Sequence, residues 1–228
     1  MTAHTEGLQG LAATPERTRR EHAVGALRWQ VEVLGEGPTL LLLHGTGASA
    51  HSWRDIAPVL ARSHRVVVPD LPGHRRSAPL PVHQRSLAGL AEALASLLRS
   101  LDRLDAPEAL STPTAHAPPR VAAVIGHSAG AALMVRMALD GALPGSQLIG
   151  LNAALLPFDG LARLVCAPLA RLIADTPLLL PLVARLAASQ AHKPAALRRL
   201  IASTGSTLDD TGIALYGRLM REPAHIAG

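Results

Sequence analysis

The stretch Arg120 to Asp140, RVAAVIGHSAGAALMVRMALD, decides the fold. An apolar run over 120–126 meets a helical pattern over 128–140, and Gly126-His127-Ser128-Ala129-Gly130 lies at the junction. A continuous apolar run is typical of a buried parallel strand, and Gly-x-Ser-x-Gly between a strand and a helix indicates a nucleophile elbow. Small residues at both ends let the strained turn approach its neighbours. We therefore predict that Ser128 is a catalytic nucleophile, supported by Gly126 and Gly130.

A second part of the same site is predicted upstream, where the strand TLLLLH (39–44) runs into His44-Gly45-Thr46-Gly47. In acyl transfer, one backbone N–H that stabilises the oxyanion follows the nucleophile, and the other comes from the loop after this strand. Ala129 and Thr46 are the corresponding candidates. We interpret His44, with Gly45, as a brace for the loop rather than a proton carrier, and His127 as shaping the pocket rather than acting as the base.

The rest of the chain alternates strands with helices. Alternation of apolar and polar residues predicts a strand at 27–34, and apolar runs predict strands at 65–70 and 147–154. Ser49 is predicted to cap a helix reaching Arg62. A leucine stripe over 84–101 predicts an amphipathic helix. This order favours an α/β fold with a mostly parallel sheet and helices on both faces. We expect a flexible tail at 1–20, the core at 21–157 and a helical lid at 158–228.

Composition excludes several functional classes. Hydrophobic residues make up 48% of the chain and charged residues 17%, so wholesale disorder is excluded. The pI is near 10.8, but the arginines are scattered, Lys193 is the single lysine and aromatic residues are 2%, so nucleic-acid binding is not expected. The 11 histidines and Cys166 show no metal-ligand spacing, so we expect neither a metal nor a cofactor. Without a run of roughly 20 apolar residues or a signal-like start, we expect no transmembrane segment and a cytoplasmic protein.

The segments LLLLHGTGASAHSW, VVVPDLPGHRRS and VIGHSAGAALMVRMALDG resemble the α/β-hydrolase superfamily over residues 27–154. The segments HGTGASAHSWRDIAPVLA, LIGLNAALLPFDG and GSTLDDTGIALYGRLMREPAHIAG resemble, more narrowly, the magnesium chelatase accessory proteins of bacteriochlorophyll biosynthesis in phototrophic bacteria. This resemblance implies an accessory role near the insertion of magnesium into protoporphyrin. The partners it implies are magnesium chelatase subunits and a tetrapyrrole or other hydrophobic small molecule.

The sequence also departs from the superfamily pattern. PGHRRS has Arg75 where a glycine is usual, so we expect a changed backbone path in this loop. The usual chain order is nucleophile, acid, histidine. His192 and His225 both fall in the predicted lid, and Asp159 lacks a partner histidine. We therefore expect a C-terminally truncated chain without the catalytic acid, the catalytic histidine and the last strands, which leaves 147–154 as an uncovered sheet edge.

Three functions stay open at this point. The first is a serine hydrolase or acyl-transfer enzyme in its complete form, and the second is a non-catalytic tetrapyrrole-binding protein that retains the serine as architecture. The third is a scaffold that docks chelatase subunits through arginines of the lid. For these arginines, an ordinary solvated helix surface is favoured over a docking face. The lid arginines in question are Arg163, Arg171, Arg185, Arg198 and Arg199.

Overall fold

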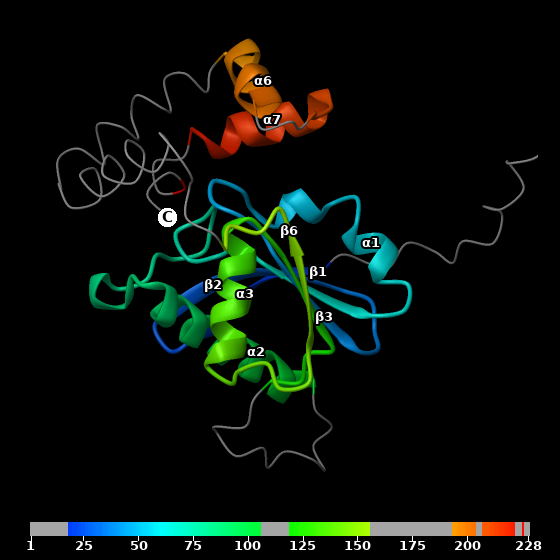
Figure 1. The fold of residues 1–228 in the computed structure, drawn as a ribbon, viewed down its shortest axis with the longest axis vertical. Helices are drawn as coiled ribbons and strands as arrows, with labels where there is room; N and C mark the ends of the chain where they lie inside the picture. Colours follow the sequence, from blue (N-terminus) through cyan, green and yellow to red (C-terminus); the bar gives the residue numbers. More distant parts are fainter. Residues whose placement is uncertain (1–17, 106–118, 156–192, 204–206, 222–224, 226–228) are drawn as a thin grey trace, which may run out of the picture.

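A computed structural model describes residues 18–105, 119–155, 193–203, 207–221 and 225 (Figure 1). One sheet contains all the described strands: β1 (Thr18–Val24), β2 (Leu27–Leu34), β3 (Thr39–Leu43), β4 (Arg65–Pro69), β5 (Ala123–His127) and β6 (Gln147–Leu151). The spatial order is β1-β2-β4-β3-β5-β6. β2 is antiparallel to β1 and β4, whereas all pairs from β4 to β6 are parallel. The predicted mostly parallel sheet is confirmed.

Helices cover both faces of this sheet (Figure 1). The described helices are η1 (Ala50–Trp53), α1 (Ala57–Leu60), η2 (Val82–Gln84), α2 (Leu87–Asp105), α3 (Ala129–Leu139), α6 (Pro194–Ser203) and α7 (Asp210–Leu219). α2 and α3 pack on one face, and η1 and α1 pack on the other. α6 and α7 lie together beyond one end of the sheet (Figure 1). Loops and the α6–α7 pair therefore lie at that end of the sheet, whereas the other helices cover its two faces.

β3 is buried on both sides, as its continuous apolar run predicts. Leu41 and Leu43 belong to the apolar cluster with α2 and α3, whereas Leu40 and Leu42 belong to the cluster with η1 and α1. The leucine stripe of α2 is also buried from Leu94 onward, whereas Leu90 is half-buried and Leu87 is exposed. Full burial of each such side chain contributes roughly 1.5–3 kcal/mol, so these clusters hold the strands that carry the site.

Two predicted boundaries were wrong. The tail was expected to reach residue 20, but β1 begins at Thr18 because backbone pairing with β2 orders a segment that has no hydrophobic periodicity. The single helix capped by Ser49 is instead two short helices, η1 and α1. The Ser49 hydroxyl forms a hydrogen bond of 2.6 Å with Nδ1 of His51, and the carboxylate of Asp70 accepts from the Ala50 N–H instead. Local capping was therefore overridden by tertiary contacts.

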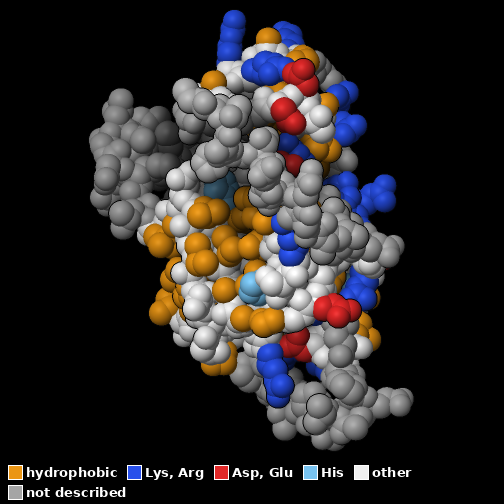
Figure 2. All heavy atoms as spheres, turned by 90° about the vertical axis from the view of Figure 1, so that its right-hand side faces the viewer, with side chains coloured by type: hydrophobic (Ala, Val, Ile, Leu, Met, Phe, Trp, Pro, Cys, Tyr) orange, Lys and Arg blue, Asp and Glu red, His pale blue; other side chains and the backbone are white. Residues whose placement is uncertain are grey.

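β6 forms an edge of the sheet that the described residues leave uncovered. It pairs with β5 alone among the described strands, and Leu148, Ile149 and Leu151 are each 40–42% exposed. Figure 2 shows hydrophobic side chains gathered on the side of the molecule that carries this strand. β6 ends at Leu151, earlier than expected, because Asn152 turns the backbone with φ 44°.

Several predictions concern residues outside the described part of the chain. These are Cys166, Asp159, His192 and the lid arginines Arg163, Arg171 and Arg185. Within the described ranges, no helix combines the length and the apolar character that a bilayer crossing requires.

Candidate active site

The predicted site residues come together at the carboxyl ends of β3 and β5. These strands are parallel neighbours, with Leu43 in register with Gly126, so the loops that follow them emerge side by side. A Cβ placed on Gly45 would lie 3.0 Å from Cβ of Ser128. The loop after β3 and the serine turn after β5 are therefore in direct contact. Loops outside the carboxyl ends of parallel strands are the usual ligand-binding region of open α/β sheets.

Ser128 occupies a backbone conformation that few side chains adopt. It lies between the end of β5 and the start of α3, with φ 52° and ψ −117°. Such a conformation in a residue other than glycine costs on the order of 1–3 kcal/mol and persists only where surrounding contacts hold it. The Ser128 N–H donates to the Leu151 carbonyl at 3.0 Å, and its own carbonyl accepts from the N–H groups of Ala131 and Ala154. Neighbouring backbone on both sides thus fixes the turn.

The glycines around Ser128 allow this turn to pack against β3. A Cβ on Gly130 would lie 2.5 Å from the carbonyl oxygen of Leu43 and 2.6 Å from that of His44. A Cβ on Gly126 would lie 2.6 Å from Cα of Ala131. All three distances are too short for any side chain, so these positions require glycine to bring the start of α3 against the end of β3.

Thr46 and Ala129 offer the two candidate oxyanion donors. Ala129 is the first residue of α3, where an N–H has no partner within the helix and the helix dipole favours negative charge. Thr46 lies in a turn closed by a hydrogen bond of 3.2 Å from the Ala48 N–H to the Gly45 carbonyl. Neither the Thr46 nor the Ala129 amide donates to a carbonyl within the parts of the chain that the structure describes. Among the described residues, nothing competes with an incoming oxygen for these two amides.

His44 supports the loop that carries Thr46. Its side chain is almost fully buried, Nδ1 donates to the Gly45 carbonyl at 2.9 Å, and Nε2 accepts from the Leu71 N–H at 2.9 Å. Burial lowers the pKa of His44 from 6.5 to about 3, so the ring is neutral near neutral pH. With both ring nitrogens engaged, His44 has the contacts of a brace rather than a proton carrier.

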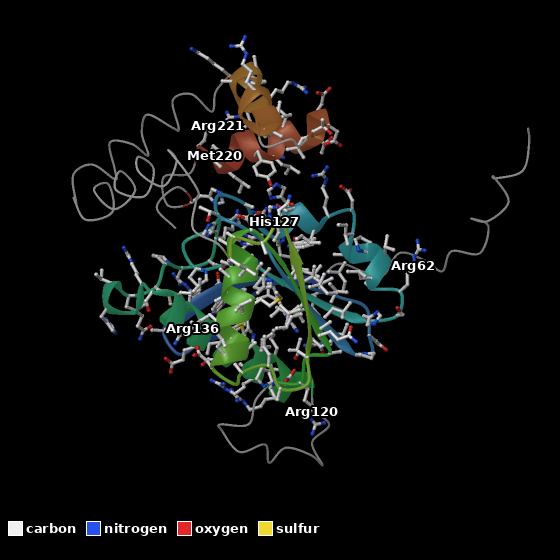
Figure 3. The ribbon with its side chains drawn as sticks, viewed as in Figure 1. Arg62, Arg120, His127, Arg136, Met220 and Arg221 are labelled. Atoms are coloured by element: carbon white, nitrogen blue, oxygen red, sulfur yellow. The ribbon has the colours of Figure 1, made fainter. Side chains whose placement is uncertain are left out.

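His127 is the last residue of β5 and is exposed at the same end of the sheet (Figure 3). Its Nδ1 would lie 3.2 Å from a Cβ on Gly45, so the ring flanks the loop that carries Thr46. Among the described residues, no hydrogen bond joins the Ser128 hydroxyl to an imidazole or a carboxylate. The described part of the chain therefore presents the serine and the candidate oxyanion donors without a base in contact.

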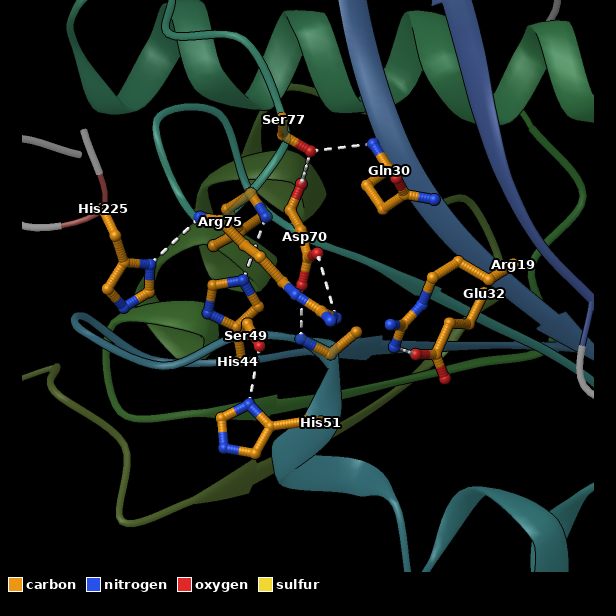
Figure 4. A network of polar contacts seen from close by, with 12 residues as sticks. Arg19, Gln30, Glu32, His44, Ser49, His51, Asp70, Arg75, Ser77 and His225 are labelled. Carbon is orange, nitrogen blue, oxygen red and sulfur yellow. Dashed lines mark hydrogen bonds and ion pairs between the residues drawn. The ribbon is translucent and has the colours of Figure 1, made fainter. Parts of the chain in front are cut away.

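Asp70 belongs to a buried polar network beside the loop after β3 (Figure 4). The sequence patterns did not single out this residue. Its carboxylate accepts from the Ala50 N–H at 2.6 Å, and burial raises its pKa above the ordinary 3.8. Nη1 of Arg75 lies 4.0 Å from the other carboxylate oxygen, and its positive charge lowers the pKa of Asp70 and so opposes the effect of burial. An acidic residue directly after a buried strand, as in VVVPD, was the available signal.

Arg75 adopts a left-handed backbone in its loop. Its φ is 52°, a conformation that glycine adopts far more readily than arginine. Surrounding contacts hold this unfavourable backbone in place. The Arg75 N–H donates to Nδ1 of His225 at 3.0 Å, and its guanidinium points toward Asp70 (Figure 4).

His225 is buried against the site loop rather than free in the lid. It is 1% exposed, and its Nε2 forms a hydrogen bond of 3.1 Å with the Gly47 carbonyl. Because both ring nitrogens are engaged, His225 has no free nitrogen with which to act as a base. No group of three or more His, Cys, Asp or Glu residues suited to a metal ion occurs within the described residues.

Two of the curated proteins to which the chain is similar bear on its site and its role. The chain is 41% identical over 207 residues to the 30 kDa subunit of magnesium chelatase from Rhodobacter capsulatus, an alignment covering 90% of this chain and 65% of that protein. It is also 44% identical over 68 residues to a pimeloyl-[acyl-carrier protein] methyl ester esterase of Aeromonas hydrophila, covering 30% of this chain and 27% of the esterase. The chain thus spans less than two thirds of the length of these relatives.

Solved structures share the fold. A candidate epoxide hydrolase from Pseudomonas aeruginosa superposes with a TM-score of 0.67 at 27% identity, over 92% of this chain and 66% of that one. Cfl2 from Burkholderia cenocepacia superposes with a TM-score of 0.64 at 26% identity, over 92% of this chain and 69% of that one. Residues 40–225 match the model of the alpha/beta hydrolase family. The chain belongs to the α/β-hydrolase family.

Proposed function

We propose that this protein is an accessory factor of magnesium chelatase in bacteriochlorophyll biosynthesis, acting in the cytoplasm beside the chelatase subunits. The observation that carries the proposal is the 41% identity to the Rhodobacter capsulatus 30 kDa subunit over 90% of this chain. The match extends far beyond the serine turn, whereas the esterase match covers 30% of the chain. A tetrapyrrole or a related hydrophobic molecule is the proposed ligand.

We further propose that Ser128 is the nucleophile of an acyl-transfer reaction in the complete protein. Its Oγ would attack a carbonyl carbon, and the amides of Thr46 and Ala129 would stabilise the resulting oxyanion. The strained backbone of Ser128 supports this role, because strain of 1–3 kcal/mol is commonly retained at functional positions. The start of α3 adds a favourable dipole for the same negative charge.

A non-catalytic binding function is the second candidate, and one observation favours it. Within the described residues the Ser128 hydroxyl has no hydrogen bond to a histidine, and both ring nitrogens of His44 and of His225 are already engaged. A serine hydroxyl without a general base is a weak nucleophile. On this alternative, the elbow is retained as architecture, and the protein holds and delivers a tetrapyrrole.

Fluorophosphonate labelling of the protein purified from its native host separates the two candidates. If Ser128 is an activated nucleophile, the probe adds covalently to Ser128, and peptide mapping locates the modification there. The Ser128→Ala variant should not be labelled, and Ser52→Ala, which changes an exposed hydroxyl near α7, should label normally. Absence of labelling on folded protein would exclude the catalytic candidate.

Complementation tests the pathway assignment independently of catalysis. A strain lacking the gene should accumulate metal-free porphyrin, and the wild-type gene should restore magnesium insertion. Restoration by Ser128→Ala would favour the binding function, whereas its failure, with normal amounts of protein, would favour catalysis. Unchanged pigment in the deletion strain would refute the accessory role.

A further inference from the structure

His225 joins three parts of the chain that are far apart in sequence. Nε2 is 3.1 Å from the Gly47 carbonyl in the loop after β3, and Nδ1 is 3.0 Å from the Arg75 amide in the loop after β4. His225 itself follows α7, and its side chain is 1% exposed. A buried polar side chain with both its polar atoms engaged holds its partners in a defined geometry.

These contacts fix the tautomer of the ring. The Arg75 amide can only donate, so Nδ1 must accept and carries no proton. The Gly47 carbonyl can only accept, so Nε2 must carry the proton and donate. The neutral Nε2–H tautomer is therefore the form that satisfies both bonds.

The two carbonyls that flank Thr46 are both held by imidazoles. His44 donates to the Gly45 carbonyl, and His225 donates to the Gly47 carbonyl. In a trans peptide the N–H points opposite to the preceding C=O, so fixing the Gly45 carbonyl also fixes the direction of the Thr46 N–H. The bond from His225 fixes the next part of the turn, where Gly47 has φ 69°.

A third imidazole fills the space between these two. The ring centroid of His74 lies 5.0 Å from that of His44 and 5.3 Å from that of His225, in edge-to-face arrangements. Nδ1 of His74 donates to the Pro72 carbonyl, and burial lowers the pKa of His74. The loop bearing Thr46 therefore rests on a packed row of three histidines.

α7 and the residue that follows it contact the same region as His225. Met220, at the end of α7, has its Cε 3.3 Å from the position of a Cβ on Gly47 (Figure 3). The Tyr216 ring packs edge-on against His51 with centroids 4.7 Å apart, and the Tyr216 hydroxyl is 3.1 Å from Oγ of Ser52. Among the polar side-chain contacts that the structure describes between the core and either α7, its N-cap Asp209 or His225, the bond from His225 to Gly47 is the one that reaches the candidate oxyanion loop.

We infer that His225 is a positioning residue that holds the candidate oxyanion loop in its working orientation for the donor pair of Thr46 and Ala129. This inference rests on the proposed function, because it takes Thr46 as an oxyanion donor. It assigns His225 a role within the site. Arg75, which presents its amide from a left-handed backbone, is the second fixed point of the ring.

Two substitutions separate the two bonds of His225. His225→Gln keeps an N–H near the position of Nε2 and can still donate to Gly47, while it loses the acceptor at Nδ1. His225→Asn keeps an oxygen near the position of Nδ1 and can still accept from Arg75, while it loses the donor to Gly47. Tyr216→Phe is the matched control, because it removes a hydrogen bond between α7 and the core that does not involve the loop.

Hydrogen–deuterium exchange of the peptide covering residues 44–48 tests the positioning role directly. We expect exchange about fivefold faster in His225→Asn than in the wild type, because loss of one net hydrogen bond worth about 1 kcal/mol changes an opening equilibrium by about this factor. His225→Gln and Tyr216→Phe should stay within about twofold of the wild type, the shift left when no bond to the loop is lost. Equal exchange in all four proteins, or equal acceleration in Asn and Gln, would overturn the inference.

Labelling of Ser128 by a fluorophosphonate adds the chemical test, since its phosphoryl oxygen occupies the oxyanion position. We expect the labelling rate constant to fall roughly ten- to a hundredfold in His225→Asn and to be largely restored in His225→Gln. If the wild type labels and both variants label equally fast, the inference is wrong while the proposed catalysis stands. If the wild type does not label, the catalytic proposal fails, and exchange at residues 44–48 alone decides whether His225 positions the loop.

Discussion

Gly130 and Leu43 meet so closely that a Cβ on Gly130 would lie 2.5 Å from the Leu43 carbonyl oxygen. Because that oxygen belongs to a central strand, it cannot move away without disturbing the sheet. We expect Gly130→Ala to lower the free energy of unfolding by about 3 kcal/mol, the upper part of the usual range for overpacking. Urea denaturation followed by circular dichroism measures this change.

Gly141→Ala is the control for that substitution. Gly141 has φ 72° but no atom within 4 Å of an added Cβ, so only the backbone cost of about 1 kcal/mol applies. Equal losses in the two variants would show that the contact with β3 is unimportant.

Ser128→Gly should be more stable than Ser128→Ala. Both variants lack the hydroxyl, but glycine adopts φ 52° without the strain that a Cβ brings. We expect the unfolding free energy of Ser128→Gly to exceed that of Ser128→Ala by about 1 kcal/mol. Thermal or urea unfolding of the two variants side by side provides the measurement, and a less stable glycine variant would argue against strain at the elbow.

Acid should destabilise the protein through its buried histidines. Burial lowers the pKa of His51 from 6.5 to about 4, so between these values the unfolded chain binds a proton that the folded chain excludes. Stability is therefore lost as the pH falls through this window, with a slope of up to about 1.4 kcal/mol per pH unit for each such histidine. His51→Gln should show a shallower fall than the wild type between pH 6.5 and 4 and the same slope between pH 7.5 and 9.

The contribution of Asp70 to stability should fall as the pH rises, which is the opposite of the contribution of His51. Burial raises its pKa above 3.8, so the folded state holds this proton to higher pH than the unfolded state does. The contribution is fully present below pH 3.8 and is lost as the pH rises through the folded pKa. The stability of Asp70→Asn relative to the wild type should therefore rise as the pH increases from about 4 toward neutrality. Unfolding curves at four or five pH values measure this, and a difference that stays constant with pH would contradict it.

Ile149→Lys should reduce self-association of the 228-residue chain. Ile149 is 41% exposed on β6, whose outer edge is unpaired within the described residues, and apolar strand edges favour aggregation. Sedimentation velocity should show a smaller oligomeric fraction in this variant. Leu139→Lys, at the exposed end of α3, adds the same charge away from the edge and should leave association unchanged. An equal effect of both would point to net charge instead.

Local sequence patterns predicted the core strands and the serine turn well. The alternation at 27–34, the apolar run at 39–44 and the leucine stripe of α2 were recognised because burial against the core imposes a regular spacing of apolar residues. Placement of the candidate donors beside Ser128 followed from strand order, since parallel neighbours bring their carboxyl ends together.

Contacts between distant segments could not be predicted in this way. β1 has no periodicity and is ordered by pairing with β2, and η1 receives its cap from Asp70 rather than from the adjacent Ser49. The left-handed backbone of Arg75 is held by contacts with Asp70 and His225, which are distant in sequence. These outcomes depend on tertiary neighbours that a local pattern does not identify.

The contact between Gly45 and Ser128 also bears on how the protein forms during synthesis. Gly45 and Ser128 are far apart in the chain, because the β4 and α2 segments lie between them in sequence. They meet only when β5 pairs with β3 in the sheet. The chain loses conformational entropy when such a long loop closes, before the contacts of the loop stabilise it. Long-range parallel pairing is therefore slow and late. The ribosome must therefore have released β5 and the start of α3 before the serine and the candidate donors can meet, and a nascent chain arrested before that point would carry no assembled site.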